Sequence, residues 1–375
     1  MALKLASLGH ISLDGSKFKA NSSKHKAMSY QRLKEKEQAL SAEIDDLIEQ
    51  ASRCDQEEDQ AYKGQTGYEI PEDLKHKQAR LKHIKAAKAA LEQREETLNP
   101  GQVIDDKKQI SFADKEARSM GKKGDFDYRY NAQISVDADL QIIVGQHLSQ
   151  NANDKQEVEP ALAAVKAATG TLAEKLTADN GYMSGHNLEA LEDSPIDAYI
   201  ATDKGEKQKP TALDESQRKL FKADFQYDEA SNTFACPGQQ ILVMVRQGKD
   251  GSRTYQGEAE VCSQCLYQSR CCQSSKGEAR TINTDDKEPL RQHLNRKKAA
   301  EPSKALYRKP KVLVEPVFGQ IKNSGFRGFS VRGKDKVAGE FSLVCSTHNI
   351  KKMIKAIFRG VVRPEFVKRQ LKPAI

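Results

Sequence analysis

The chain has 375 residues, of which 61 are Lys or Arg and 53 are Asp or Glu, so its formal net charge is +8. This moderate excess of positive charge favours a polyanionic partner, and the hydrophobic fraction of 37% suggests polar insertions around a modest core. No apolar run is long enough to span a bilayer, and residues 1–9 are too short for a secretory signal, which argues against a membrane protein. Seven unevenly spread cysteines favour a reducing cytoplasm over a disulfide framework.

The first predicted element is a strand around Asp14. Apolar and polar residues alternate through residues 11–20, which is typical of a strand. Asp is a poor strand residue, and the adjacent Gly15 permits a bulge or the close approach of another group. For a single Asp in such a position, a role in a turn is the commoner explanation. Asp14 therefore indicates a functional site only in combination with other acids.

Residues 28–98 are rich in Lys, Glu, Gln and Ala, with apolar side chains at helical spacing. One apolar stripe runs through residues 33–47 and another through residues 74–91, and two glycines and a proline separate them. The pattern predicts an antiparallel helical hairpin. A solvated spacer, in which the two stripes cover each other, is favoured slightly over an arm for DNA contact or dimerisation.

A β-hairpin is predicted for residues 126–150, with a turn at residues 137–139 and a return strand over residues 140–144. A helix over residues 157–168, a strand that ends at Asp179, a second helix and another strand follow. This β-β-β-α-β-α-β order predicts a mixed α/β sheet flanked by helices. Asp179 alone could again be a turn residue or a helix cap.

Residues 204–300 interrupt this order and contain a CxxC motif with further cysteines in reach. Four thiolates suit a tetrahedral zinc site. The alternative is unmetallated thiols in a polar loop; zinc is favoured because a segment with few apolar residues needs another source of stability. Cys272 would be the spare thiol. The expected zinc ligands are Cys236, Cys262, Cys265 and Cys271.

Residues 307–322 read YRKPKVLVEPVFGQIK. They predict an amphipathic helix on which Glu315 and Lys322, seven residues apart, share a face. An acid and a lysine on one face can hold a metal ion and, beside it, a phosphate of the substrate. The alternative is a helix with an apolar face in the core and a solvated lysine.

A basic loop with glycines and aromatic residues follows at residues 327–336. Arg327 and Arg332 could neutralise phosphates, while Phe326 or Phe329 could stack on an unpaired base. Packing in the core is the favoured role for at least one of the two rings.

The last predicted element is an amphipathic helix over residues 337–358. Glu340 is a rival third acid, but it has no lysine seven residues later and is rejected. The residues expected to face inward are Phe341, Val344, Ile350 and Ile354.

Three isolated acids, Asp14, Asp179 and Glu315, therefore remain. Mg²⁺ is a hard cation that takes a few carboxylates and completes its shell with water and phosphate oxygens. Two such ions, roughly 3.5–4 Å apart, can activate an attacking hydroxyl and stabilise the leaving oxygen in phosphodiester transfer. The acids need only lie on neighbouring elements.

In combination, these motifs resemble those of the DDE transposases of bacterial insertion sequences, of the type with a Tyr…Glu…Lys signature. Asp14 lies in LDGSKFKANSSKH and Asp179 in ADNGYMS, while residues 128–136, YRYNAQISV, resemble the family's second strand. The signature residues would be Tyr307, Glu315 and Lys322. The resemblance covers nearly the whole chain and implies an RNase H-like mixed sheet with the helical hairpin and the cysteine-containing region as insertions.

The resemblance implies cleavage of double-stranded DNA at transposon ends and joining to target DNA, with two Mg²⁺ or Mn²⁺ ions on the three acids. It also implies a homodimer in the active complex and a cytoplasmic, nucleoid-associated location. A related nuclease without strand transfer, or an inactive remnant that only binds DNA, is the alternative. The implied DNA-binding residues are Lys17, Lys19, Tyr182, Tyr307, Arg308, Lys311, Lys322, Arg327 and Arg332.

The expected segments are the first core strand (residues 1–27), the helical hairpin (28–100), the continued core (101–203), the cysteine insertion (204–300) and the Glu315 and C-terminal helices (301–375). Transposases of this type usually carry a helical domain ahead of the first strand, so the reading frame is expected to be N-terminally shortened. The remaining basic surface would then bind DNA weakly, with little preference for terminal repeats.

Overall fold

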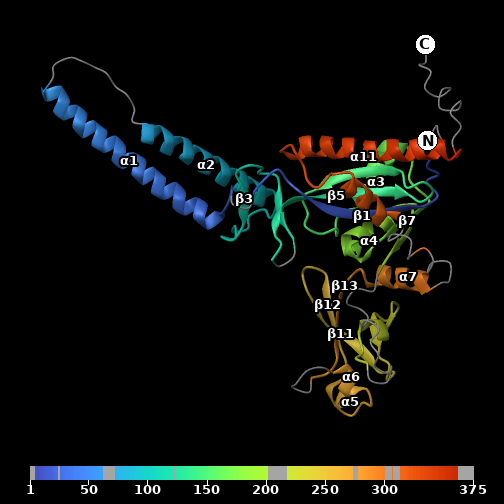
Figure 1. The fold of residues 1–375 in the computed structure, drawn as a ribbon. Helices are drawn as coiled ribbons and strands as arrows, with labels where there is room; N and C mark the ends of the chain where they lie inside the picture. The colour runs from blue at the N-terminus through green and yellow to red at the C-terminus, as the bar shows by residue number, and fades with distance from the viewer. Residues whose placement is uncertain are drawn as a thin grey trace.

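The structure is a computed structural model that describes residues 5–23, 26–61, 72–121, 124–201, 218–272, 278–299, 306 and 313–361. It has three parts: a central sheet covered by helices, a long helical hairpin and a smaller five-stranded unit (Figure 1). Within these ranges, no helix has the length and apolar character needed to cross a membrane.

The central sheet is mixed, with strand order β4-β5-β1-β7-β8 and with β6 also paired to β5. Strand β1 runs antiparallel to β5 on one side and parallel to β7 on the other. Apart from the short strand β4, which was not predicted, the strand and helix order of this sheet is the predicted one, and the mixed α/β class is confirmed. The strands are β1 (Ile11–Lys19), β4 (Arg118–Met120), β5 (Asp127–Asp137), β6 (Ile143–Ser149), β7 (Lys175–Ala178) and β8 (Asp197–Ile200).

Helices cover both faces of this sheet. Helices α10 (Glu315–Asn323) and α11 (Lys334–Phe358) enclose one apolar cluster that includes Phe18 and Tyr130. Helices α3 (Val158–Thr169) and α4 (Gly185–Glu192) lie on the opposite face from α11, where a second cluster contains Leu13 and Leu176. Burial of these side chains on both faces is the main source of stability for the sheet.

Strand β5 is buried on both faces and nevertheless carries polar residues. Its even-numbered residues, from Tyr128 to Val136, pack under α10 and α11. Its odd-numbered residues Asn131, Gln133 and Ser135 are buried as well and point to the opposite face, since side chains alternate along a strand. Buried amides need hydrogen-bond partners, and the side chains of Asn131 and Gln133 have theirs at the candidate site.

The return strand of this hairpin starts three residues later than predicted. We expected it over residues 140–144, whereas β6 begins at Ile143. The turn is longer because Asp137 is fully buried and its carboxylate accepts the backbone N–H groups of Leu8, at 2.9 Å, and Asp139, at 3.0 Å. In the same turn, Gln141 takes a positive φ of 57°.

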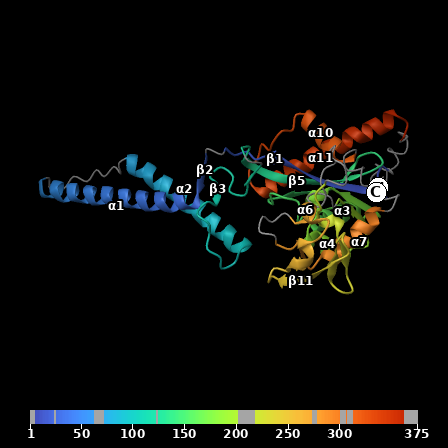
Figure 2. The ribbon, with the colours of Figure 1, turned by 90° about the horizontal axis from the view of Figure 1, so that it is seen from below.

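The predicted helical hairpin is present as α1 (Tyr30–Ala61) and α2 (Glu72–Leu98), which project away from the central sheet in both views (Figures 1 and 2). Leu33 and Leu40 pack against Ile84 and Leu91, so the two apolar stripes do cover each other. A two-stranded sheet of β2 (Ala27–Ser29) and β3 (Gln109–Ser111) forms the base of the hairpin.

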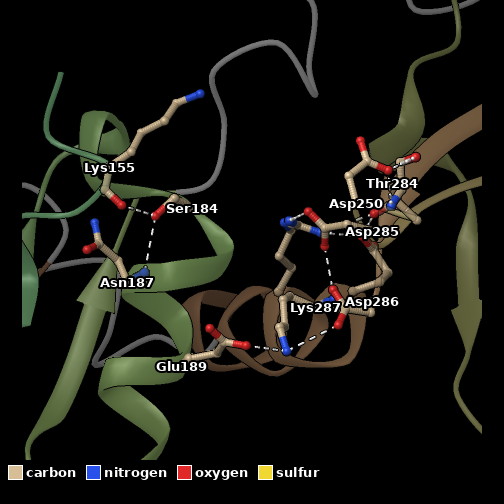
Figure 3. A network of polar contacts seen from close by, with 12 residues as sticks. Lys155, Ser184, Asn187, Glu189, Asp250, Thr284, Asp285, Asp286 and Lys287 are labelled. Carbon is tan, nitrogen blue, oxygen red and sulfur yellow. Dashed lines mark hydrogen bonds and ion pairs between the residues drawn. The ribbon is translucent and has the colours of Figure 1, made fainter. Parts of the chain in front are cut away.

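The cysteine-containing region forms a five-stranded antiparallel sheet of order β13-β12-β11-β10-β9. Lys287 links this unit to the core, because its ammonium pairs with Glu189 of α4 and, at 3.2 Å, with Asp286 (Figure 3). Its elements are β9 (Gln226–Asp228), β10 (Thr233–Ala235), β11 (Ile241–Gln247), β12 (Ser252–Gln256), α5 (Ala259–Ser263), α6 (Gln268–Cys271), β13 (Thr281–Asp285) and α7 (Glu288–Ala299).

The inward face of α11 differs from the prediction. Ile350 and Ile354, expected in the core, are 51% and 44% exposed. Polar residues face inward at this level instead: His348 bonds the carbonyl of Gln141 at 3.0 Å, and the Asn349 side chain pairs with both backbone groups of Ile143 at 2.8 Å. Contacts with the backbone of the β5–β6 turn thus determine the helix rotation there.

Candidate active site

Asp14 and Asp179 lie on neighbouring strands. Strands β1 and β7 are parallel, with Leu13 opposite Ala178. Asp14 is the next residue on β1, and Asp179 is the first residue after β7, so parallel pairing brings the two acids to the same end of the strand pair. The sequence pattern predicted both strands, but only the register shows that the acids meet.

Backbone groups orient both carboxylates. Asp14 Oδ1 accepts the N–H of Gly15 at 2.7 Å, and Asp179 Oδ1 accepts the N–H of Gly181 at 2.7 Å. Asp179 is also the N-cap of a short 3-10 helix over Asn180–Tyr182. The capping role that is common for Asp is therefore present here, and it fixes the side chain at the strand end.

Glu315, from the far end of the sequence, is near enough to Asp14 for its charge to act there. It is the exposed first residue of α10. Two turns later on this helix, Lys322 Nζ donates a hydrogen bond to Ser16 Oγ at 2.9 Å and lies 5.4 Å from the centre of the Phe18 ring. Helix α10 thus presents both an acid and a lysine to β1.

Burial, together with the acids around it, changes the pKa of Asp14. Burial raises this pKa from 3.8 to about 7; the Gly15 hydrogen bond lowers it, and the negative charges of Asp179, Asp154 and Glu315 raise it further. Without a bound cation, Asp14 is therefore expected to hold a proton until near neutral pH.

This shift predicts a pH dependence for the metal-free protein. Because the folded pKa is above the unfolded one, Asp14 contributes stability that is fully present below about pH 4 and is lost as the pH rises through 7. Asp14→Asn should make the free energy of unfolding in EDTA fall less between pH 5 and 8, by on the order of 1–4 kcal/mol. Urea unfolding at several pH values measures this. The exposed Asp193→Asn is the control, and identical slopes in all three proteins would show that Asp14 titrates normally.

A fourth acid at the site was missed from the sequence. Asp154 follows β6, and its Oδ1 accepts the side-chain amides of Asn131, at 2.8 Å, and Gln133, at 2.6 Å. Gln133 in turn accepts the hydroxyl hydrogen of Tyr182. The signal that could have revealed it is a pair of amides at alternate positions of a predicted core strand, since such groups require a partner.

Gly15 provides the space for this network. A Cβ added there would lie 2.9 Å from Cδ of Gln133 and 3.0 Å from Oδ1 of Asn131. Gly15→Ala should therefore lower the free energy of unfolding by about 1–3 kcal/mol through overpacking. Gly319→Ala is the matched control: a Cβ there has no neighbour within 4 Å, so it should stabilise the protein by about 0.4–1 kcal/mol. Urea unfolding compares the two, and an unchanged stability for Gly15→Ala would contradict this close packing.

One residue expected to contact DNA cannot do so. Tyr182 is fully buried, because its ring packs in the α3 and α4 cluster and its hydroxyl bonds Gln133. Its inclusion among the DNA-binding residues is wrong, although it does shape the site. Tyr307, Arg308 and Lys311 lie outside the described residues.

The other predicted cations are at the surface. Lys17 and Arg327 are exposed; Lys19 pairs with Asp127 at 2.8 Å, and Arg332 Nε donates to the carbonyl of Asn21 at 2.9 Å. The aromatic residues of the basic loop, in contrast, belong to the core. The Phe326 and Phe329 rings lie 5.0 and 6.2 Å from that of Phe18. Glu340 holds the same loop by accepting the N–H of Ser330.

The thiols of the five-stranded unit line one cavity of about 190 Å³. The Sγ atoms of Cys236 and Cys265 are each 3.5 Å from the point where a Cβ at Gly238 would lie. Backbone N–H groups donate to both sulfurs, from Gln240 at 3.3 Å and from Tyr267 at 3.4 Å. The cysteines around the cavity are Cys236, Cys262, Cys265, Cys271 and Cys272.

Cys272, expected to be the spare thiol, interacts with both Cys262 and Cys271. Burial raises the pKa of Cys271 to about 12, so this thiol is protonated when no metal is bound. Within the described ranges, no group of three or more His, Cys, Asp or Glu side chains stands in an arrangement that could hold a metal ion. This applies to the carboxylates and to the thiols alike.

The family comparison points to the same chemistry as the acids. Residues 235–354 match the family model for a transposase DDE domain. The match begins in the five-stranded unit and includes Glu315 and Lys322, while Asp14 and Asp179 precede it. It supports a relationship to the DDE transposase family over these residues. Neither a curated protein nor a solved structure matches the chain.

Proposed function

We propose that the protein is an insertion-sequence DNA transposase with an RNase H-like core, which cleaves element ends and joins them to target DNA. The observation that carries this proposal is the parallel pairing of β1 with β7, which brings Asp14 and Asp179 together, and the charge of Glu315, at the start of α10, acts on Asp14. The family match over residues 235–354 supports it independently. A mixed sheet in which β1 lies between an antiparallel β5 and a parallel β7 is compatible with the RNase H-like assignment.

The chemistry of the three acids suits a divalent cation, although in this structure their side chains are not arranged around one. All three acids offer hard carboxylate oxygens, and the raised pKa of Asp14 reflects burial and like charges that a cation would offset. When bound, Mg²⁺ or Mn²⁺ would stabilise charge on the attacking and leaving oxygens of a phosphodiester. Asp14, Asp179 and Glu315 would hold it, with the backbone N–H groups of Gly15 and Gly181 orienting two of the acids.

The chain's own cations would position the DNA. Lys322 is on the same helix as Glu315 and near β1, where its ammonium would bind a phosphate beside the reacting one. Lys17 and Arg327 are exposed and would bind phosphates further along the backbone, in keeping with the net charge of +8. A homodimer in the active complex and a cytoplasmic location belong to the same proposal.

Metal-dependent cleavage tests the proposal. Purified protein should nick labelled DNA from the ends of its element when Mg²⁺ or Mn²⁺ is present, and not in EDTA. A nuclease without strand transfer would cleave but never give a joined product. A remnant that only binds DNA would shift the DNA in gels and leave it intact with every metal.

We also propose a structural zinc ion in the five-stranded unit. Its support is the shared cavity, together with the N–H···S bonds to Cys236 and Cys265, which favour thiolates. Cys262 would be the third ligand. The fourth would come from the pair Cys271 and Cys272: Cys271 is the ligand expected from the sequence, while the interaction with Cys262 makes Cys272 the alternative.

A further inference from the structure

A groove of about 1000 Å³ lies between the helical hairpin and the central sheet. On the hairpin side it is lined by residues of α2 from Ala90 to Leu98. It is also lined by residues 149–151 and 156–157, at the end of β6 and in the loop that follows. This loop carries Asp154, which bonds the amides of β5 at the candidate site. The groove therefore extends from the base of the hairpin to the loop beside the proposed active site.

Two cations that line this groove have no acidic partner within the described residues. Arg118 of β4 donates from Nη1 to the carbonyls of residues 115, 116 and 117, at 3.0, 2.7 and 3.3 Å. Burial lowers the pKa of the Arg118 side chain to about 10, and the nearby charge of Arg94 lowers it as well. The other cation is Lys334, at the start of α11. An anion that entered the groove would relieve the repulsion between these positive charges.

Three acids line the same groove, and two of them are already engaged. The Glu116 carboxylate accepts the backbone N–H of Lys334 at 2.7 Å, and Glu157 pairs with His147 at 2.8 Å. Glu159, in the first turn of α3, is exposed. The acids of the groove thus leave the positive charges of Arg118 and Lys334 available to an outside partner.

The face of α2 that lines the groove continues along the hairpin as a basic stripe. Residues 75, 79, 82, 86, 90 and 93 recur at helical spacing and so share one face. The cations of this stripe are Lys75 and Lys82, and alanine occupies positions 79, 86 and 90. Residues 75–91 contain no Asp or Glu, so no acid of α2 itself offsets this charge.

The cations of α2 that face α1 are paired, whereas those of the basic stripe are not. Lys77 pairs with Glu43 at 3.1 Å, and Lys88 with Glu37 at 2.8 Å. The two lysines of the stripe are exposed and form no ion pair in the described part of the chain. The hairpin projects away from the sheet, so this face is open to a large partner (Figure 1).

We propose that the groove and the basic stripe together form a track that binds the phosphate backbone of duplex DNA leading away from the active site. This inference rests on the proposed function, and it gives the hairpin a role in DNA contact instead of that of a solvated spacer. From residue 75 to residue 93 the helix is about 27 Å long, the length of about eight base pairs. The alanines allow the DNA to approach closely, while Lys75 and Lys82 bind phosphates without reading the sequence.

Binding of the full chain to a duplex from the element end, measured in EDTA across a salt series, tests this. The double variant Lys75→Gln, Lys82→Gln should reduce the slope of log affinity against log salt by about 1.8 and weaken binding about 10–60-fold near about 0.1 M salt. Lys334→Gln, at the groove, should reduce the slope by about 0.9. The control is Arg32→Gln with Arg53→Gln, which removes two exposed charges from α1 and should bind like wild type.

The outcomes separate this inference from the proposed function. An unchanged salt slope in the Lys75 and Lys82 variant, while the wild-type protein binds the duplex, would overturn the inference alone. Wild-type protein that binds no duplex would overturn the proposed function as well. Sedimentation of the same variants identifies the other partner that a basic face could have. A smaller species with wild-type DNA affinity would assign the stripe to the acidic α1 of a second copy, and the inference would again fail.

Discussion

Asp14→Asn, Asp179→Asn and Glu315→Gln should each abolish metal-dependent DNA cleavage while the protein stays folded. Each change removes a negative charge from the proposed metal site and nearly keeps the shape of the side chain. A correctly held metal contributes several kcal/mol to phosphodiester transfer, so the cleavage rate should fall at least about 100-fold. Rates on labelled end DNA in Mg²⁺ and in Mn²⁺ give the comparison.

Controls separate chemistry from folding in this experiment. Asp193→Asn removes an exposed acid of the same domain and should cleave at the wild-type rate. Removing a charge from crowded acids should not lower the melting temperature of the metal-free variants. Full activity in any one of the three variants would remove that residue from the catalytic set.

The second large effect concerns zinc. Protein purified under reducing conditions should carry about one zinc ion per chain, and Cys262→Ser or Cys265→Ser should release it. Zinc bound by four thiolates contributes about 10–16 kcal/mol of apparent binding free energy to small folded units. The five-stranded unit of each variant should therefore become sensitive to protease. Metal analysis and limited proteolysis provide the two measurements.

Serine variants of Cys271 and Cys272, made one at a time, identify the fourth ligand by loss of zinc. Cys345→Ala is the control: this thiol is on α11 and is buried in another cluster, so the variant should keep its zinc even if it is less stable. Absence of zinc from freshly purified wild-type protein would contradict the zinc proposal and would show that the cavity is lined by unmetallated, reduced thiols.

The parts of the fold that follow from local patterns were predictable. The alternation around Asp14, the stripes of the helical hairpin and the buried face of the Glu315 helix, with Val317, Phe318 and Ile321, all depend on residues close in sequence. The apolar period of each segment is enough to predict such elements. The isolated acids also pointed to the site, since Asp is unfavourable in a strand unless another group requires it.

The remaining features depend on contacts between distant residues. Asp154 looks like an ordinary loop acid until the pairing of β5 with β6 brings Asn131 and Gln133 close to it. Tyr182 follows a turn, a place typical of exposed side chains, yet its hydroxyl finds a buried partner on β5. The rotation of α11 is set by hydrogen bonds to the β5–β6 turn, which an apolar pattern cannot reveal.

The central claim is that this chain joins DNA as well as cutting it. The most direct measurement incubates the full-length protein and Mg²⁺ with an end-labelled duplex, taken from the DNA that borders its gene, and an unlabelled target plasmid. Our account predicts labelled end DNA covalently joined to the plasmid, dependent on the metal and absent with Asp14→Asn. Cleavage without any joined product, or joined product that persists with Asp14→Asn, would contradict it.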